Sequence, residues 1–431
     1  MNDFVRDDLH SARPEGVDAV RRRHVIYASG YDPRGAPGYF DLFRRTCERT
    51  RQLWPIALTL EPPNSVTDEA AQWHLEVSGA NWRVDTDYDF VRMEGFIAST
   101  MARSSLRQVF SALGWFVGDV VSGAQFLIFR ASWRFALHLL CFQVMAVAWA
   151  AAAVLVGVAA GLSLTRYLGS PWPLSVVIGL AAAYLALVAL RPVVERWRLF
   201  QIVSSWATQR RFGRGQPTWI DDVVAAGARR LLAAVRAGDA DEVAVVGHSS
   251  GGVTACAIMA RALELDPDLG KNGPRLVLLT LGSVMPAVAL HPAADKMRAI
   301  IARLATAKNL AWVDCQASKD VMCFADFDPV AGVGVQAGQE RCNPQRWPIS
   351  FKDMIAPEKY ARFRRNYFRM HYQYIFAGDR PAPYDYVLLV GGPMPIPAWP
   401  KRNRELMAAF MQDRTAGDGH IRQQVQLGAA P

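Results

Sequence analysis

Three residues near the middle of the chain have the types and spacing of a nucleophilic serine site. Gly247, Ser249 and Gly251 form the pattern Gly-x-Ser-x-Gly. A β-type apolar run, 242–247, leads into the pattern, and a run of small and apolar residues with helical character, 253–265, leads out of it. A sharp turn between a buried strand and a helix exposes a serine hydroxyl, and the glycines leave room for the crowded backbone. The pattern therefore predicts that Ser249 attacks a carbonyl group.

A glycine loop follows an earlier apolar run. The run His24–Ala28 is rich in β-forming residues and ends in Ser29-Gly30-Tyr31. This loop, the serine turn and the alternation of strand-like and helix-like segments resemble the α/β-hydrolase superfamily, over about residues 20–60 and 215–395. The chain is most similar to bacterial lipase- and esterase-like serine hydrolases. The resemblance implies an acyl-enzyme on Ser249.

The resemblance also implies a histidine base that follows the acid in the chain. His291 precedes the strand that is expected to carry the acid, so this order excludes it. His371 lies in the aromatic segment Phe-Arg-Met-His-Tyr-Gln-Tyr, which is similar to the histidine segment of some lipases. His420 follows the last strand-like run, where the family usually places its histidine. We prefer His371 as general base and keep His420 as the alternative.

For the acid that orients the base, the placement within the family favours Asp320. Asp320 follows the strand-like run 310–315, in the sequence Ala-Ser-Lys-Asp. Asp314, at the end of that run, is the second choice, and Asp326 and Asp328 come next.

Two backbone N–H groups are needed to bind the negative charge that develops on the carbonyl oxygen. We expect one from Ser250, directly after the nucleophile, and one from Tyr31 in the glycine loop. Many members of the superfamily have His-Gly where this chain has Ser29-Gly30. His248 is interpreted as a residue of the turn and not as the base.

Two long apolar runs precede the serine motif. No Asp, Glu, Lys or Arg occurs in 135–165 or in 167–190, and each run exceeds the ~20 residues with which a helix crosses a bilayer. Arginines are frequent before the first run and after the second, whereas the short connection holds only Arg166. The positive-inside rule then places both flanks in the cytoplasm. We predict a transmembrane helical hairpin in a bacterial inner membrane, with the catalytic domain on the cytoplasmic side.

The remaining segments predict an α/β protein. Strand-like runs at 56–60, 73–77, 275–281, 310–315 and 386–390 alternate with helix-like stretches at 40–53, 219–237, 293–304 and 360–376. This alternation favours a mostly parallel sheet with flanking helices, into which the hairpin is inserted before the nucleophile strand. The expected units are 1–134 with the oxyanion loop, the hairpin 135–190, the rest of the hydrolase domain 191–400, and a tail 401–431.

The composition excludes several other classes of protein. The six cysteines form no CxxC pair and no His/Cys cluster, which argues against a disulfide scaffold and against structural zinc. The net charge of +9 comes without a nucleic-acid-binding motif, so no nucleic-acid partner is expected. No phosphate-binding, EF-hand or HExxH motif appears, and we expect no cofactor and no metal.

The expected function is hydrolysis of a carboxylic ester or thioester, with lipid esters as the natural class for a membrane-anchored enzyme. Two alternatives remain open from the sequence. One is an acyltransferase that uses the same serine, and the other is a non-catalytic scaffold of the same fold. The sequence does not predict the oligomeric state.

Overall fold

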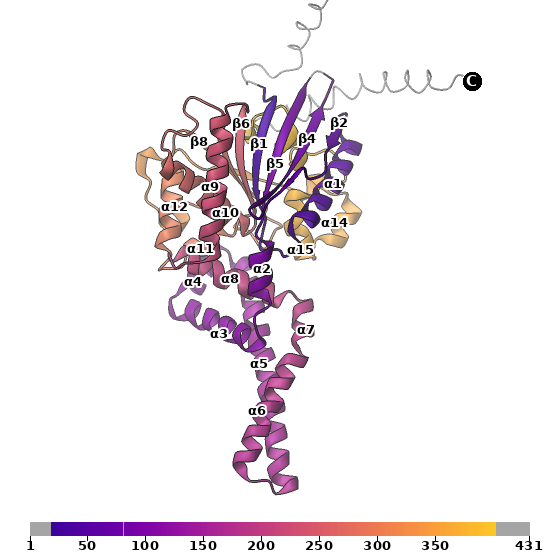
Figure 1. The fold of residues 1–431 in the computed structure, drawn as a ribbon, viewed down its shortest axis with the longest axis vertical. Coiled ribbons are helices and arrows are strands. Elements are labelled where there is room, and N and C mark those ends of the chain that lie inside the picture. Colours follow the sequence, from indigo (N-terminus) through magenta and orange to yellow (C-terminus); the bar gives the residue numbers. More distant parts are fainter. Residues whose placement is uncertain (1–18, 81, 402–431) are drawn as a thin grey trace, which may run out of the picture.

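The structure is a computed structural model that describes residues 19–80 and 82–401. The described strands form one nine-stranded sheet in the order β2-β4-β5-β1-β6-β7-β8-β9, with β3 paired to β4 (Figure 1). The strands are β1 (Arg22–Ala28), β2 (Ala57–Leu60), β3 (Ser65–Val66), β4 (Ala70–Ser78), β5 (Arg83–Val91), β6 (Glu242–His248), β7 (Arg275–Leu281), β8 (Leu310–Gln316) and β9 (Gln345–Pro348).

The sheet is mixed but mostly parallel. Each adjacent pair in the series β5-β1-β6-β7-β8-β9 is parallel, whereas β4 pairs antiparallel with β2, β3 and β5. Every residue of β6 is buried, as expected for a strand that is covered on both faces, whereas burial in β4 alternates with partial exposure. The predicted mostly parallel sheet with flanking helices is thereby confirmed.

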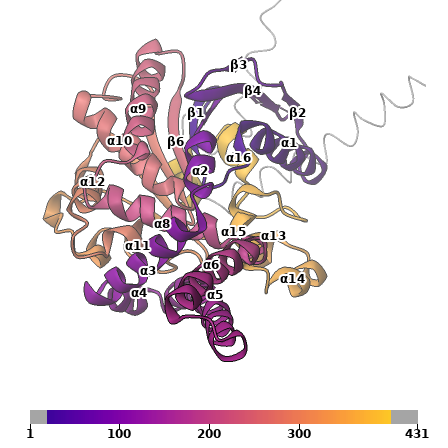
Figure 2. The ribbon, with the colours of Figure 1, turned by 60° about the horizontal axis from the view of Figure 1, so that its bottom comes forward.

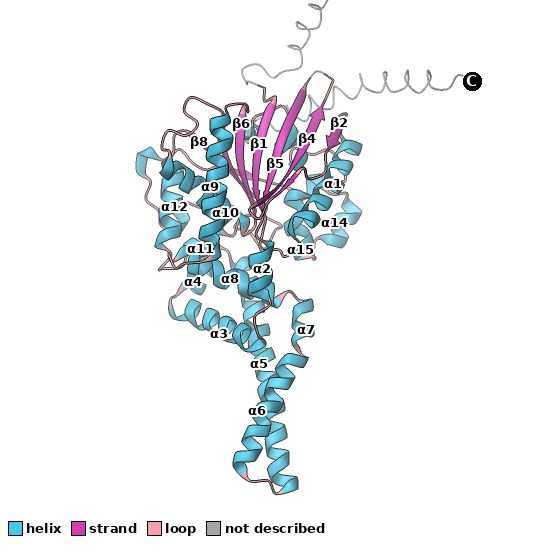
Figure 3. Ribbon diagram, viewed as in Figure 1, coloured by secondary structure: helices cyan, strands magenta, loops and turns pink. Residues whose placement is uncertain are grey.

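Helices cover both faces of the sheet (Figures 1 and 3). One face carries α9 (Trp219–Ala237), α10 (Gly251–Leu265) and α12 (Asp295–Thr306). The other carries α1 (Gly35–Leu53) and α16 (Tyr386–Gly391). Shorter helices complete the domain: α2 (Glu94–Met101), α11 (Met285–Ala289), α13 (Phe351–Met354), α14 (Pro357–Phe363) and α15 (Tyr367–His371).

Two long apolar helices project from the domain as a pair, α5 (Trp133–Leu168) and α6 (Trp172–Ala189) (Figure 1). Both are long and apolar enough to cross a membrane. They pack closely, since a Cβ on Gly157 would lie 2.5 Å from the carbonyl oxygen of Gly179. The predicted apolar pair in the middle of the chain, before β6, is confirmed.

Four further helices surround the root of this hairpin: α3 (Ser105–Val121), α4 (Ala124–Ala131), α7 (Arg191–Arg196) and α8 (Leu199–Gly213). Figure 2 shows α3, α4 and α8 gathered beside the hairpin on one side of it. Helices α3 and α4 and strand β5 are not among the elements that the sequence predicted.

Two predicted elements were wrong in type or extent. The run 386–390 forms helix α16 and not a strand, because the Asp385 carboxylate caps it by accepting from the N–H groups of Val387 and Leu388. A short, fully buried apolar run does not reveal its periodicity. The stretch 360–376 is not one helix: α14 ends at Phe363, and α15 starts after the Asn366 cap.

Candidate functional site

Ser249 occupies a strained turn between β6 and α10. Its φ angle is +61°, in the left-handed region that a residue with a side chain rarely adopts. The turn is held by backbone hydrogen bonds, since the Ser249 N–H donates to the Leu281 carbonyl at 2.9 Å and the Ser249 carbonyl accepts from Gly252 at 3.1 Å. The strand–turn–helix geometry that the motif predicted is therefore present.

The backbone is crowded on both sides of this serine. A Cβ on Gly251 would lie 2.1 Å from the carbonyl oxygen of Ala28, at the end of β1. A Cβ on Gly30 would lie 3.3 Å from the Cβ of Ser249 and 3.6 Å from its hydroxyl oxygen. Because β1 and β6 are neighbours in the sheet, the glycine loop after β1 passes directly over the serine.

His371 and Asp320 meet although 51 residues separate them. The His371 Nδ1 lies 2.7 Å from an Asp320 carboxylate oxygen, and both side chains are buried. Asp320 lies in the loop after β8, where its other oxygen accepts from the Met322 N–H at 2.9 Å. The His371 Nε2 has no hydrogen-bond partner within the described residues. The carboxylate thus fixes one ring nitrogen and leaves the other available to a substrate or a hydroxyl group.

His248 supports the segment that carries His371. Its Nε2 donates to the carbonyl oxygen of His371 at 3.0 Å, and the two ring centroids are 4.8 Å apart. Burial, and to a lesser extent the neighbouring His371, lowers the pKa of His248 to about 3. His248 is therefore neutral at ordinary pH, which agrees with its interpretation as a residue of the turn.

The other candidate acids have different partners. Asp314 accepts from Thr280 and from Gln316, and Asp328 pairs with Arg341 at 2.8 Å. Asp326 adopts a left-handed backbone conformation, with φ at +56°. The hydrogen bond to His371 comes from Asp320 and not from any of these three acids, and His291 does not line the pocket that contains Ser249. His420 lies outside the described residues, so the choice between His371 and His420 stays a prediction.

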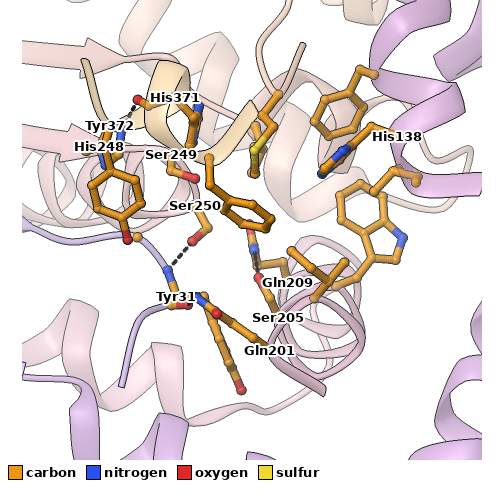
Figure 4. Close-up of a pocket in the computed structure, with 18 residues that line it drawn as sticks. Tyr31, His138, Gln201, Ser205, Gln209, His248, Ser249, Ser250, His371 and Tyr372 are labelled. Carbon is orange, nitrogen blue, oxygen red and sulfur yellow. Dashed lines mark hydrogen bonds between the residues drawn. The ribbon is translucent and has the colours of Figure 1, made fainter. Parts of the chain in front are cut away.

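Tyr31 and Ser250, whose N–H groups are expected to bind the oxyanion, are in contact. The Tyr31 N–H donates to the hydroxyl oxygen of Ser250 at 2.7 Å (Figure 4). The Ser250 N–H has no hydrogen-bond partner within the described part of the chain. The glycine loop and the serine turn are therefore in contact through Tyr31 and Ser250.

These side chains line a partly enclosed pocket with a cavity volume of about 70 Å³ (Figure 4). One wall contains the turn, the glycine loop and the His371 segment. The other wall is helical: α5 contributes Phe135, His138 and Leu139, and α8 contributes Gln201, Ile202, Ser205, Trp206 and Gln209. Helix α5 of the pair and the flanking helix α8 thus form part of the same pocket as Ser249.

The contribution of α8 was missed by sequence reasoning. Gln201, Ser205 and Gln209 recur every four residues, so they share one face of α8. The Gln201 side chain donates to the Tyr31 carbonyl oxygen at 2.6 Å, which ties the glycine loop to the helix. The spacing of these polar residues is visible in the sequence, but it does not show that their side of the helix lines the pocket of Ser249.

A second missed contact joins the glycine loop to the histidine segment. The hydroxyl group of Tyr372 donates a short hydrogen bond to the Asp32 carboxylate. The Arg34 guanidinium lies over the Tyr372 ring, 5.2 Å from its centroid. The residues that follow Tyr31 and His371 are therefore held together by charge and hydrogen bonding.

The described residues contain no group of three His, Cys, Asp or Glu side chains that could hold a metal ion. Comparisons with protein-family models, with curated proteins and with solved structures find no match to this chain. The arrangement of the site itself is therefore the basis for a functional assignment.

Proposed function

We propose that the protein is a membrane-anchored serine hydrolase of the α/β-hydrolase type, which cleaves carboxylic esters or thioesters through an acyl-enzyme on Ser249. The observation that carries the proposal is the state of His371. Its Nδ1 is held by the buried Asp320, while its unpartnered Nε2 and the strained Ser249 belong to the same pocket. A buried imidazole arranged in this way suits proton transfer from a serine.

In the proposed reaction the Ser249 hydroxyl attacks the acyl carbonyl and gives its proton to the His371 Nε2. The same nitrogen then protonates the leaving alkoxide or thiolate, and Asp320 stabilises the imidazolium. The N–H groups of Ser250 and Tyr31 bind the oxyanion, after the Ser250 hydroxyl has left the Tyr31 N–H. Water, activated by His371, then releases the acyl group and restores Ser249.

The substrate class follows from the helical wall. Phe135 and Leu139 come from the first turns of α5, the helix that we propose enters the bilayer. An acyl chain supplied from the membrane would meet these apolar side chains first, and the polar row of α8 would face a more polar part of the substrate. We therefore propose an amphiphilic ester or thioester, with lipids as the leading class.

We propose that α5 and α6 cross the membrane as a hairpin, which puts both flanks on one side. Arginines near the hairpin root, among them Arg130, Arg134, Arg191 and Arg196, assign that side to the cytoplasm. The pocket then lies at the membrane-proximal end of the domain, because it is lined by the root of α5.

Labelling with a fluorophosphonate tests the proposal, since this reagent modifies serines that are activated by a base. The detergent-solubilised protein should be labelled, and Ser249→Ala and His371→Ala should not. His291→Ala is the matched control, because His291 is also buried but does not line the pocket, and it should retain labelling. Full labelling of Ser249→Ala would refute the assignment of the nucleophile. A folded wild-type protein that is not labelled would instead favour the non-catalytic scaffold.

A further inference from the structure

Helices α3 and α4 expose an apolar surface that no described part of the chain covers. On α3 the exposed side chains recur at helical spacing, and Val121 is 81% exposed. The surface, which we call the α3–α4 face, consists of Leu106, Phe110, Val117, Val120, Val121, Phe126 and Phe129. Contiguous apolar surfaces of this kind on a folded domain mark contact with a membrane or with another protein.

The opposite side of α3 is fixed to the domain by a buried polar network. Asp119 pairs with Arg210 of α8 at 2.8 Å and accepts from the indole N–H groups of Trp115 and Trp206. Removing either charge from such a pair leaves its partner buried without compensation, which strongly opposes rotation of the helix. The α3–α4 face is therefore held outward and cannot turn into the core.

The same helix is attached to the point where the hairpin leaves the domain. The Arg191 guanidinium, directly after α6, donates to the carbonyl oxygens of Arg103 at 3.1 Å and Met101 at 3.2 Å, just before α3. On the other helix of the pair, Trp149 donates to the Leu187 carbonyl and packs on Phe200 of α8. Figures 1 and 2 both show α3 beside the hairpin root, and in Figure 1 it runs across the hairpin axis.

The part of the hairpin that extends beyond the domain is about as long as a bilayer core is thick. Beyond Trp149, residues 150–168 of α5 span about 28 Å at 1.5 Å per residue, close to the ~30 Å of a hydrocarbon core. The surface of the bilayer would then lie near Trp149 and Arg191. That is the level at which α3 begins.

We propose that the α3–α4 face is a second membrane-binding surface, which lies flat in the interface of the leaflet entered by the hairpin and prefers anionic lipids. This rests on the proposed membrane insertion of α5 and α6, but not on catalysis. The apolar side chains reach the upper acyl chains, while the exposed Arg103, Arg107 and Arg130 contact lipid phosphates. By composition α3 and α4 could form a broken span with a bend of 76°, but the buried pair of Asp119 with Arg210 fixes α3 to α8, which favours a flat position in the interface.

The proposal also explains how the membrane reaches the site. α3 packs against α8 through Trp115, Trp206 and the Asp119 network, and α8 supplies one wall of the pocket. A bilayer against the α3–α4 face would therefore lie beside α8, which lines the pocket.

Depth-dependent fluorescence quenching tests the proposal on the full chain. The exposed Cys141 and Cys342 are replaced by serine, and a bimane probe is attached at Val121→Cys or Phe126→Cys. The protein is reconstituted in vesicles of phosphatidylcholine and phosphatidylglycerol. We expect strong quenching by nitroxide lipids labelled near the headgroup, weak quenching by nitroxides at the chain end, and protection from aqueous iodide.

Two further probe positions serve as matched controls. Leu265→Cys lies at the far end of α10, away from the pocket, and a probe there should be quenched by iodide and not by lipid nitroxides. Leu155→Cys on α5 should be quenched by chain-end nitroxides. If the Leu155 probe is not quenched by lipid, the proposed hairpin insertion fails as well. If only the α3–α4 probes fail, the second surface alone is refuted.

Three further outcomes would each contradict the proposal or one part of it. Protection of the α3–α4 probes from both iodide and lipid nitroxides would show that a second copy or another part of the chain covers the face, and it would overturn the proposal. Strongest quenching by chain-end nitroxides at Val121 would show a re-entrant segment, which also contradicts a flat orientation. In phosphatidylcholine alone, headgroup-level quenching at Val121 and Phe126 should weaken while Leu155 is unchanged, and an unchanged signal at all three would remove the preference for anionic lipids.

Discussion

The two walls of the pocket are built in different ways. The sheet wall consists of loops at the ends of β1, β6 and β8 together with the His371 segment, and its groups are held by short hydrogen bonds, a left-handed serine and glycines in close contact. The helical wall consists of two regular helices, α5 and α8. Gln209 of α8 lines the pocket, and its side-chain carbonyl oxygen has no hydrogen-bond partner among the described residues. One wall is strained and highly constrained, whereas the other is built from regular helices. Unpartnered polar atoms occur on both, at the His371 Nε2 and at the Gln209 carbonyl oxygen.

For the proposed hydrolase, the difference predicts that one wall carries out proton transfer and the other selects the substrate. Proton transfer requires positions accurate to a fraction of an ångström, which only an over-determined wall supplies. Selection of a substrate requires a surface whose shape and polarity match the ligand, and unsatisfied polar groups beside apolar ones provide it. Changes on the sheet wall should therefore reduce the rate for every substrate, whereas changes on the helical wall should alter the ranking of substrates.

The largest effect is expected from Asp320→Asn. Loss of the carboxylate removes the tautomer control of His371, and kcat/KM should fall by about 10⁴-fold for every ester tested. Asp314→Asn is the matched control. Asp314 is buried as well, but it accepts from Thr280 and Gln316 and does not contact His371, so the activity should change little. Steady-state hydrolysis of an activated ester measures both variants, and equal losses would contradict the pairing.

A smaller loss should follow Gly30→Ala. The added Cβ would lie 3.3 Å from the Cβ of Ser249 and would displace the loop that carries the Tyr31 N–H. Loss of one oxyanion contact lowers kcat by about 10²-fold, with KM nearly unchanged. Gly95→Ala has no neighbour within 4 Å of its new Cβ and should be silent. An unchanged kcat in Gly30→Ala would show that the glycine loop does not bind the oxyanion.

On the helical wall, Ile202→Phe should change selectivity and leave the chemistry intact. The larger ring narrows the pocket beside α8, so kcat/KM for long acyl esters should fall about tenfold relative to short ones. Ile300→Phe on α12 introduces the same change at another half-buried position, which does not line this pocket. An equal loss of kcat/KM for short and long acyl esters in Ile202→Phe would contradict a separate role of the helical wall in selecting the substrate.

The last prediction concerns stability instead of activity, through the pH dependence of a residue on the sheet wall. In the unfolded chain His248 takes up a proton below about pH 6.5, whereas in the folded protein its pKa is about 3. Its contribution to stability is therefore complete above pH 6.5 and is lost on acidification toward pH 3, at about 1.4 kcal/mol per pH unit.

His248→Gln retains an N–H donor for the His371 carbonyl but does not titrate. The variant should show a shallower loss of stability between pH 6 and 4 than the wild type, measured by chemical unfolding in detergent. Identical slopes for the two proteins would mean that His248 does not remain neutral and buried.

How much of the site could be predicted depended on the range of the interactions. Ser249, Ser250 and Gly30 lie in short local patterns, and the turn that holds the serine was anticipated from them. Asp320 and His371 were chosen by the order of the chain in a resembling family, and their 2.7 Å contact depends on how β8 and the segment after β9 fold together. The link between Asp32 and Tyr372 spans 340 residues and left no local signal.

The fold divides in the same way. Local hydropathy was sufficient for the apolar pair 135–190, because a run of uncharged residues longer than a bilayer is thick is a property of consecutive residues. The same signal failed at 386–390, where five buried residues fit a strand or a helix and the Asp385 cap decided for the helix. Helices α3 and α8 have apolar and polar faces whose partners are distant in the chain. Only the packing of α5 and α8 against the carboxyl ends of the strands decided that the root of the hairpin lines the pocket of Ser249, since side chains from seven separate segments form that cavity only after the chain has folded.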